Sequence, residues 1–502
     1  MKLYSDDENY KLYHGSMLDM AEVIEPESID AIITDPPYEL NFMNKGWDNS
    51  GIAFQKDTWK KCYDALKPGG HLLAFGGSRT FHRIACAIED AGFEIRDTIM
   101  WIYGSGFPKS MDISKQIDKR NGRNVNQEFI DFIINHRKLK NLSAKDVAEL
   151  GGWYGNVNCG GTVSNWENGY NIPTKEQYVR LKEILDLDDS FDEYVNIEPA
   201  EREIIGKMQN PASSIYTMGE IKKNRDVNIT TPSTDLAKQW NGWGTALKPS
   251  FEPIIVARKA FKGSLVDNII KNGVGGINID ECRVPISKDD INMINAKSSK
   301  NPTDNYNRNE SKKYGDYALN IAVTANEQGR FPANTILTYD DSDYDEVCGG
   351  LSDEGSASRY FYCAKASKRD RDEGLKEFED YVLPKNGSGK RFIVGGSKEV
   401  SLPRKNIHPT VKPTSLMQYL VRLVTPKGGT VLDPFNGSGS TGKACMYENA
   451  DRKVDYKYIG IEITEEYLPI AKVRIEFAEK TPIMNYIEPV KTEELQSKNM
   501  LF

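Results

Sequence analysis

Short apolar runs alternate with amphipathic stretches through the N-terminal part of the chain. The run Ile29–Thr34 (IDAIIT) has the length and composition of a buried strand. Residues 54–66 repeat apolar side chains at helical spacing, with Trp59 and Cys62 on one face. A strand at 71–75, a helix at 80–91 and a strand at 93–102 follow. This alternation predicts an α/β fold with a parallel-rich sheet covered by helices on both faces.

Two prolines and two functional side chains follow the first of these strands. In Asp35-Pro36-Pro37-Tyr38 the prolines end the strand and stiffen its exit, because proline lacks an N–H group and has a fixed φ. An acid and an aromatic ring are therefore held close together at the carboxyl end of a strand, where open α/β sheets bind ligands. The alternative is an ordinary proline turn with an exposed acid and a packed tyrosine.

A glycine-rich loop near the other end of the chain offers a second candidate site. The strand-like residues 430–432 lead into Asp433-Pro434-Phe435, and Gly437 and Gly439 then open a helix. These glycines let a ligand approach the backbone, and the helix N-terminus offers free N–H groups. The next strand-like run contains Glu462, whose carboxylate suits the two hydroxyl groups of a ribose.

Three kinds of nucleotide site are compatible with this loop. Gly437, Gly439 and Gly442 match the G-x-G-x-x-G pattern of dinucleotide-binding enzymes, with Glu462 about twenty residues further on. The same glycines with Lys443 approach a P-loop, but the next residue is alanine, where a hydroxyl group should hold Mg²⁺. The third kind is a site for S-adenosylmethionine.

Composition limits the class of protein. A length of 502 residues predicts about two or three domains. No apolar run is long enough to span a bilayer and no signal peptide opens the chain, so we expect a cytoplasmic protein without membrane contact. The seven cysteines lack C-x-x-C spacing and the five histidines do not cluster, which indicates a reducing compartment and no metal site. With a net charge of −8, binding to nucleic acid requires positive charge to be concentrated locally.

Together, the two candidate sites resemble those of the DNA amino-methyltransferases, which modify adenine N6 or cytosine N4. In that family Asp-Pro-Pro-Tyr is the catalytic motif, Asp-Pro-Phe-x-Gly-Ser-Gly is the cofactor motif, and the catalytic motif comes first in the permuted β class. The resemblance covers residues 10–123 and 200–480. It implies a circularly permuted Rossmann-like sheet that uses S-adenosylmethionine. A dehydrogenase is disfavoured because that class has no use for Asp35–Tyr38.

The resemblance also implies the roles of single residues. Asp35, Pro36, Pro37 and Tyr38 are implied as catalytic, with the target base stacked on Tyr38 and its amino group held by the Asp35 carboxylate and the Pro36 carbonyl. No metal or covalent intermediate is required. The implied cofactor site has Glu462 at the ribose, and its other members are Asp433, Pro434, Phe435, Gly437 and Gly439 in the loop, with Thr410 and Lys412 near the methionine carboxylate.

Helical signals between residues 124 and 198 interrupt this pattern. Helices are expected at 127–139, 144–150, 162–168 and 174–185. Their order resembles the helix-turn-helix domain of phage repressors, with residues 163–169 as the recognition helix. The connection 151–161 is longer than the usual tight turn, so a packing or protein-interaction module is the alternative.

Residues 263–400 form the least regular part of the sequence, polar and with only short strand-like pieces. Their position and basic stretches, such as 364–371, predict a target-recognition region; a long polar insertion is the alternative. The expected order is a catalytic half at 1–123, a helical insert at 124–198, a return to the catalytic core at 199–262, target recognition at 263–400, a cofactor-binding half at 401–480 and a tail at 481–502.

We therefore expect a site-specific DNA methyltransferase, of phage or restriction-modification type, acting on N6 of a flipped-out adenine in double-stranded DNA. Adenine is favoured because β-class cytosine-N4 enzymes more often carry Ser than Asp at the first position of the catalytic motif. The alternatives are a cytosine-N4 methyltransferase and a DNA-binding regulator with a vestigial methyltransferase domain. A monomer or a homodimer is expected.

Overall fold

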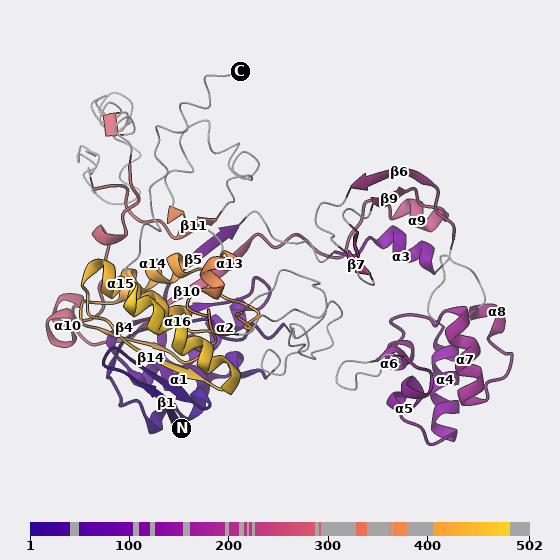
Figure 1. Cartoon of the computed structure of the whole chain (residues 1–502), viewed down its shortest axis with the longest axis horizontal. Helices are drawn as coiled ribbons and strands as arrows, with labels where there is room; N and C mark the ends of the chain where they lie inside the picture. The colour runs from indigo at the N-terminus through magenta and orange to yellow at the C-terminus, as the bar shows by residue number, and fades with distance from the viewer. Residues whose placement is uncertain are drawn as a thin grey trace, which may run out of the picture. The chain divides into compact units, whose positions relative to one another are not determined.

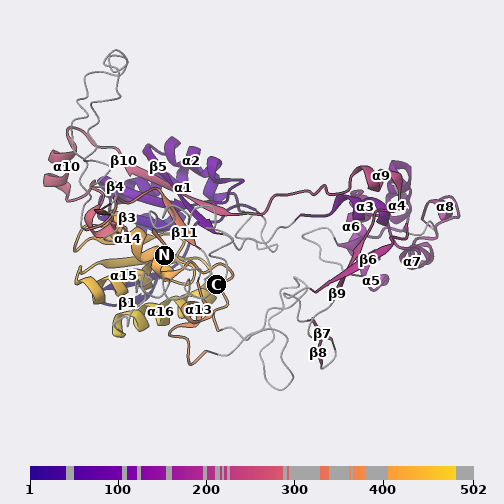
Figure 2. The ribbon, with the colours of Figure 1, turned by 90° about the horizontal axis from the view of Figure 1, so that it is seen from above.

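The chain divides into two units in a computed structural model (Figures 1 and 2). Unit 1 comprises Met1–Gly106 and Ser250–Phe502, and unit 2 comprises Phe107–Pro249. Most of the predicted target-recognition region and nearly all of the tail lie outside the described residues. The described residues are 1–40, 50–103, 110–120, 126–153, 161–195, 200–209, 215–217, 220–222, 226–286, 291–292, 328–338, 361–362, 366–378 and 405–481.

A ten-stranded sheet organises the described part of unit 1. Neighbours pair in parallel from β2 through β14, β13 and β3 to β4. Strand β10 is antiparallel to both β4 and β5, so β4 and β5 run in the same direction. The strands in spatial order are β1 (Lys2–Asp6), β2 (Tyr10–His14), β14 (Lys457–Glu462), β13 (Thr430–Asp433), β3 (Ile29–Thr34), β4 (Leu66–Phe75), β10 (Phe251–Lys259), β5 (Phe93–Tyr103), β11 (Thr335–Thr338) and β12 (Phe361–Tyr362).

This topology brings distant parts of the sequence together along the side of the sheet where its parallel strands end. We call this side the carboxyl edge. The carboxyl ends of β3, β13, β14, β4 and β5 share that edge because these strands run in the same direction. Strand β10 runs the opposite way, so its first residues reach the same edge. Ligands bind at this edge in open α/β sheets.

Helices cover both faces of the sheet, because successive side chains of each strand point to opposite faces. Ile32 and Leu72 lie in a core with α1 (Lys56–Ala65) and α2 (Phe81–Asp90). Ile33 lies in the other core, formed with α14 (Thr414–Val424), α15 (Ser440–Arg452) and α16 (Leu468–Lys480). Burial of each such aliphatic side chain contributes about 1.5–3 kcal/mol. The predicted α/β fold with a parallel-rich sheet is confirmed.

Two local predictions differ from the structure. Strand β4 begins at Leu66, directly after α1, and not at residue 71; the stretch Pro68-Gly69-Gly70 lies within the strand. The region predicted to contain only strand-like pieces includes α10 (Leu265–Asn272) and α13 (Lys368–Asp372). Helix α10 carries the usual end signals, an N-cap Ser264 and Gly273 at φ +73° after its last residue.

Four helices of unit 2 match the predicted ones within a residue or two. Phe129, Val147, Trp166 and Tyr178 are buried in their common core. Capping boxes begin two of them, at Ser143 with Asp146 and at Thr174 with Gln177. The helices are α4 (Gln127–Leu139), α5 (Ala144–Leu150), α6 (Thr162–Glu167) and α7 (Lys175–Leu185), followed by the short α8 (Asp192–Val195).

Unit 2 extends beyond the predicted insert on both sides. Asp118, in α3 (Ile113–Lys119), is buried and accepts hydrogen bonds from Arg202 and from the backbone of Ser233 and Thr234. Unit 1 therefore resumes at Ser250 and not at residue 199. The remaining elements of unit 2 are β6 (Ile204–Gln209), β7 (Ile215–Thr217), β8 (Glu220–Lys222), β9 (Asp226–Thr230) and α9 (Asp235–Gln239).

Candidate active site

The sequence Asp35-Pro36-Pro37-Tyr38 lies directly after β3, at the side of the sheet where the parallel strands end. The Thr80 hydroxyl donates a hydrogen bond of 2.8 Å to the Tyr38 carbonyl oxygen, and the Tyr38 ring packs against the core on the α14 side of the sheet. The two prolines and this hydrogen bond hold the Asp35 and Tyr38 side chains in place.

Two residues from distant parts of the sequence complete this site. Lys412 Nζ lies 2.6 Å from Asp35 Oδ2, 3.2 Å from the Tyr38 hydroxyl oxygen and 3.5 Å from Glu252 Oε2. The Tyr38 hydroxyl donates to Glu252 Oε2 at 2.8 Å. Glu252 comes from the first residues of β10, and Lys412 from the segment before α14. We call Asp35, Tyr38, Glu252 and Lys412 the Asp35 cluster.

The Asp35 cluster brings two carboxyl groups and one ammonium group together where their side chains are largely buried. Burial raises the pKa of Asp35, although the Lys412 ammonium acts in the opposite direction. Burial would lower the pKa of Lys412, but the nearby Asp35 and Glu252 carboxylates outweigh it and raise that pKa. The two carboxylates therefore favour the charged form of Lys412. Within the described residues, Asp35 Oδ1 is buried and has no hydrogen-bond partner, which leaves one strong acceptor for a ligand.

Aromatic rings line the Asp35 cluster. The Lys412 ammonium lies 5.3 Å from the Tyr38 ring centroid and 4.9 Å from that of Phe75, at the end of β4. The Tyr103 hydroxyl, from the end of β5, is 3.5 Å from Glu252 Oε1. Neither Phe75 nor Tyr103 was predicted from the sequence. Their position at the carboxyl ends of strands that share this edge is the signal that would have found them.

The glycine loop between β13 and α15 lies at the same edge. Gly437 and Gly439 have φ values of +50° and +73°, which favour glycine. A β-carbon at Gly437 would lie 2.8 Å from His408 Nε2, and one at Gly439 would lie 3.0 Å from the Ala471 Cα atom. Both positions thus exclude side chains for two reasons, the backbone conformation and the space.

Two buried acids, Glu462 and Asp433, accept hydrogen bonds from the loop and from its neighbours. Glu462 Oε2 accepts a hydrogen bond from Gly437 N at 2.7 Å, and Oε1 accepts one from Thr464 N at 2.7 Å. Asp433 accepts hydrogen bonds from the hydroxyl groups of Thr34 and Thr441, at 2.6 and 2.7 Å. Burial raises the pKa of both acids, that of Asp433 to about 6. Glu462 therefore lies beside the loop, and its role at the ribose stays a prediction, while the Asp433 carboxylate joins β3 to the start of α15.

A buried network of ionic side chains packs against the loop and the start of α15. The Arg474 guanidinium donates to the Ser438 carbonyl oxygen at 2.6 Å and to the Asp370 carbonyl oxygen at 3.3 Å. Lys443 Nζ lies 2.8 Å from Asp370 Oδ1 and 2.9 Å from Glu373 Oε2. A P-loop lysine must reach phosphate groups, whereas Lys443 is fully buried against these acids. The geometry therefore argues against the P-loop alternative.

The other predicted site residues occupy three different surroundings. Pro434 and Phe435 form the turn after β13, and Phe435 packs on the α1 side of the sheet. Thr410 is exposed. Lys412 contacts Asp35, and its expected place near the methionine carboxylate stays a prediction. In the described part of the chain, no group of three His, Cys, Asp or Glu side chains could hold a metal ion, and no helix is long and apolar enough to cross a membrane.

Comparison with protein families decides what kind of protein carries these two sites. The family model described as DNA methylase matches residues 29–147 and 178–473. These ranges include the Asp35 cluster and the glycine loop, and they cover most of the chain. This chain belongs to the N6/N4 DNA methylase family.

Individual relatives of this DNA methylase match over shorter stretches. The type II methyltransferase M2.LlaDCHI of Lactococcus lactis subsp. cremoris is 32% identical over 120 residues, which are 20% of this chain and 44% of the relative. M2.MboI of Moraxella bovis is 40% identical over 77 residues, which are 15% of this chain and 25% of the relative. The chain thus spans less than half the length of these relatives.

Two solved structures also align with this chain. The M1.HpyAVI–SAM complex aligns with a TM-score of 0.29 and 13% identity, over 93% of this chain and 99% of that chain. The cytosine-N4-specific PvuII DNA methyltransferase aligns with a TM-score of 0.33 and 12% identity, over 98% and 91% of the two chains.

Proposed function

We propose that this DNA methylase transfers a methyl group from S-adenosylmethionine to N6 of an adenine flipped out of double-stranded DNA. The observation that carries the proposal is the Asp35 carboxylate, which presents a buried, unpaired Oδ1 beside the Tyr38 ring at the edge of the sheet that also holds the glycine loop. A circularly permuted order of the two motifs is part of the same proposal.

The glycine loop fits an adenosyl cofactor. The positive φ angles of Gly437 and Gly439 keep the loop free of side chains, and Glu462 retains lone pairs for ribose hydroxyl groups beyond its two backbone hydrogen bonds. When bound, S-adenosylmethionine supplies an electrophilic methyl group. Glu462, Phe435 and the loop backbone are the residues that we propose hold it, with Asp433 and Arg474 fixing the loop itself.

The Asp35 cluster fits an aromatic amine. We propose that the flipped base stacks on the Tyr38 ring and that its amino group donates hydrogen bonds to Asp35 Oδ1 and to the Pro36 carbonyl oxygen. Two acceptors on one side direct the nitrogen lone pair toward the methyl donor. Positive charge that develops on the nitrogen is stabilised by the Asp35 and Glu252 carboxylates, while the charge of Lys412 is already balanced by both.

Lys412 connects the two sites in this proposal. Its ammonium group bonds to Asp35 Oδ2 in the structure, whereas the amino group of the substrate is proposed to bind the unpaired Oδ1. The expected role near the methionine carboxylate requires Lys412 to leave Asp35. A movement of that kind would leave Asp35 Oδ2 without its lysine partner once the methyl donor has bound.

The surface that reads the DNA sequence stays a prediction. In the helical cluster of unit 2, Arg137, Lys140, Lys145, Arg180 and Lys182 each pair with a carboxylate of the same cluster. A cation that is paired with a carboxylate must give up that pair before it can bind a phosphate group. The basic stretch around residues 364–371 includes α13, whose Asp370 is buried against Lys443. These contacts favour a packing or protein-interaction role for the insert and leave target recognition to residues 263–400.

Replacing Glu462 with alanine should weaken binding of S-adenosylmethionine about tenfold to a hundredfold, because a buried, charge-assisted acceptor is lost. Isothermal titration measures the effect, and Glu465→Ala, an exposed acid in the next turn η9 (Glu465–Tyr467), is the matched control. Glu462→Gln keeps the shape of the side chain, so its affinity for S-adenosylmethionine should lie between those of Glu462→Ala and wild type. Unchanged affinity in both Glu462 variants would exclude the ribose role.

The proposed reaction is tested by nucleoside mass spectrometry of unmethylated DNA incubated with the protein and S-adenosylmethionine. N6-methyladenine that is absent with Asp35→Ala supports the proposal in full. N4-methylcytosine would keep the site chemistry and replace the target base. DNA that binds without any modified nucleoside would favour the regulator alternative.

A further inference from the structure

The loop between β4 and α2 lies against the catalytic motif. Residues 76–80 (GGSRT) connect these two elements at the carboxyl edge of the sheet. A β-carbon at Gly77 would lie 3.2 Å from Tyr38 Cδ2, so the loop backbone packs against the edge of the tyrosine ring. The Thr80 hydroxyl donates to the Tyr38 carbonyl oxygen at 2.8 Å. These two contacts fix the position of the loop relative to the proposed stacking surface for the base.

This loop and the first turn of α2 carry two exposed arginines, Arg79 and Arg83. The Arg83 guanidinium lies 5.3 Å from the centroid of the Phe54 ring, a contact that orients it and leaves its N–H groups available. Among the residues that the structure describes, neither guanidinium bonds to a carboxylate. We call Arg79 and Arg83 the arginine pair. Two exposed cations without an acidic partner indicate a surface for an anionic ligand.

The aromatic ring under Arg83 is itself attached to the catalytic motif. It belongs to the last residue of the short helix η4 (Ile52–Phe54). Glu39, the residue after Tyr38, accepts a hydrogen bond of 2.8 Å from the backbone of Gly51, which begins η4. Because this bond joins η4 to the residue next to Tyr38, the position of the Arg83 guanidinium is also set relative to the catalytic motif.

We propose that Arg79 and Arg83 bind the phosphate groups that flank the flipped-out nucleotide, an inference that rests on the proposed function. Only the sugar separates a base from its neighbouring phosphates, so a base stacked on Tyr38 keeps those phosphates beside the loop and the first turn of α2. The planar guanidinium group matches two oxygens of a phosphate group. Contacts of this kind hold the DNA in position and carry no sequence information.

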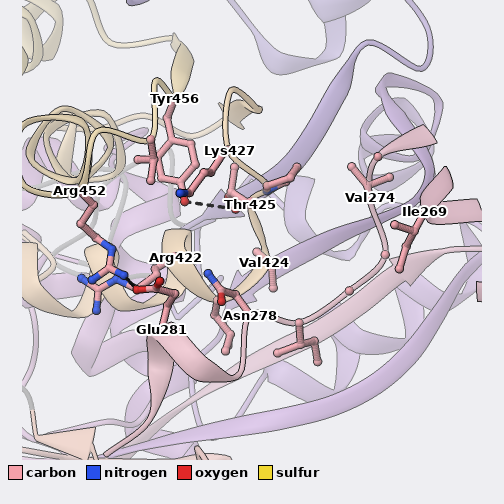
Figure 3. A pocket seen from close by; sticks show the side chains of 17 residues that line it. Ile269, Val274, Asn278, Glu281, Arg422, Val424, Thr425, Lys427, Arg452 and Tyr456 are labelled. Carbon is pink, nitrogen blue, oxygen red and sulfur yellow. Dashed lines mark hydrogen bonds and ion pairs between the residues drawn. The ribbon is translucent and has the colours of Figure 1, made fainter. Parts of the chain in front are cut away.

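Cations at the opposite side of the sheet are placed differently. A cavity of about 290 Å³ lies there, and Arg452 and Lys427 are among the residues that line it (Figure 3). Arg452 pairs with Glu281. Lys427 is exposed and, in the described part of the chain, has no carboxylate partner, but it precedes β13 at the amino ends of the parallel strands. A phosphate group bound to Lys427 could not place its base at Asp35, so this lysine is a matched control.

DNA fits the arginine pair better than an acidic protein does. The chain belongs to a DNA methylase family, and its net charge of −8 requires that the cations which bind DNA be concentrated near the reacting base. A protein bound at the arginine pair would lie beside Tyr38 and obstruct the entry of a base. A DNA backbone at the same place would bring the base to Tyr38.

The salt dependence of DNA binding tests the proposal. Fluorescence anisotropy of the full chain with a short duplex of mixed sequence gives the dissociation constant at several salt concentrations. The slope of log affinity against log salt concentration counts the neutralised phosphates, so Arg79→Gln and Arg83→Gln should each lower it by about one. Each should also weaken binding about tenfold at low salt, and less as the salt concentration rises. Arg79→Lys keeps the charge and should keep the slope, and Lys427→Gln should resemble wild type.

Lower slopes in both glutamine variants of the arginine pair, with the thermal midpoint and the binding of S-adenosylmethionine unchanged, support the proposal. Wild-type slopes in both variants overturn it, and loss of binding to polyglutamate in the same variants would then assign the pair to an acidic protein partner. An equal reduction in Lys427→Gln also overturns it, because the effect would then belong to the net charge. Methyl transfer by wild type is measured separately, so this inference can fail while the proposed function holds.

Discussion

Replacing Asp35 with alanine should lower the rate of methyl transfer by about a thousandfold or more, while binding of S-adenosylmethionine stays close to that of wild type. The substitution removes Oδ1, the buried acceptor without a partner, and Oδ2, which binds Lys412 at 2.6 Å. The lysine keeps Glu252 as its counter-ion, so its charge does not become unpaired. Single-turnover kinetics with saturating DNA measure the chemical step, and titration measures cofactor binding.

The variant Asp35→Asn separates the effect of the negative charge from that of the hydrogen-bond acceptor. Asparagine retains one carbonyl oxygen of the same shape but loses the negative charge, so the rate should fall less than in Asp35→Ala. Equal losses in both variants would assign the effect to the charge and not to the acceptor. Turnover of Asp35→Ala near the wild-type rate would remove Asp35 from the mechanism.

Replacing Asp433 with asparagine should stabilise the protein at neutral pH by up to about 3 kcal/mol. Burial raises the pKa of Asp433 to about 6, so the folded state holds this proton more tightly than the unfolded state does. Ionisation therefore costs stability as the pH rises from about 4 to about 6, and the cost is complete at pH 7. Asparagine cannot ionise, so its advantage over wild type should appear across that pH range and be small below it.

Urea unfolding at several pH values measures this effect. The difference between variant and wild type is the informative quantity, because it removes the contributions of titratable groups that do not interact with Asp433. Asp90→Asn, at an exposed position at the end of α2, is the control and should show no such pH dependence. A constant difference between Asp433→Asn and wild type from pH 4 to pH 7 would contradict the expectation.

The parts of the site that depend on adjacent residues were predictable from the sequence. The strand before Asp35, the glycine loop after β13 and the position of Glu462 at the end of β14 follow from apolar runs and turn residues within short stretches. Parallel pairing then brings the ends of these strands together. The α/β class and the helices of unit 2 were predictable for the same reason, since their signals are periodic and local.

The contacts of Lys412 were not predictable in this way. It is 377 residues from Asp35, and the sequence contains no signal that chooses Asp35 over a methionine carboxylate as its partner. Glu252 had no assignable role because only the pairing of β10 with β4 and β5 places it at this edge. Helix α10 was missed although Ser264 and Gly273 mark its two ends and its apolar residues recur at helical spacing.

The hydrogen bond between Tyr103 N and Ser250 O, 2.8 Å long, joins the two points where the chain leaves and re-enters unit 1. Strands β5 and β10 are antiparallel neighbours, so a short turn would connect them as well as the whole of unit 2 does. The entropy of closing a loop rises only slowly with its length once its ends are held together. This junction is therefore a point at which evolution can insert, exchange or remove an entire domain while the sheet and the Asp35 cluster keep their register.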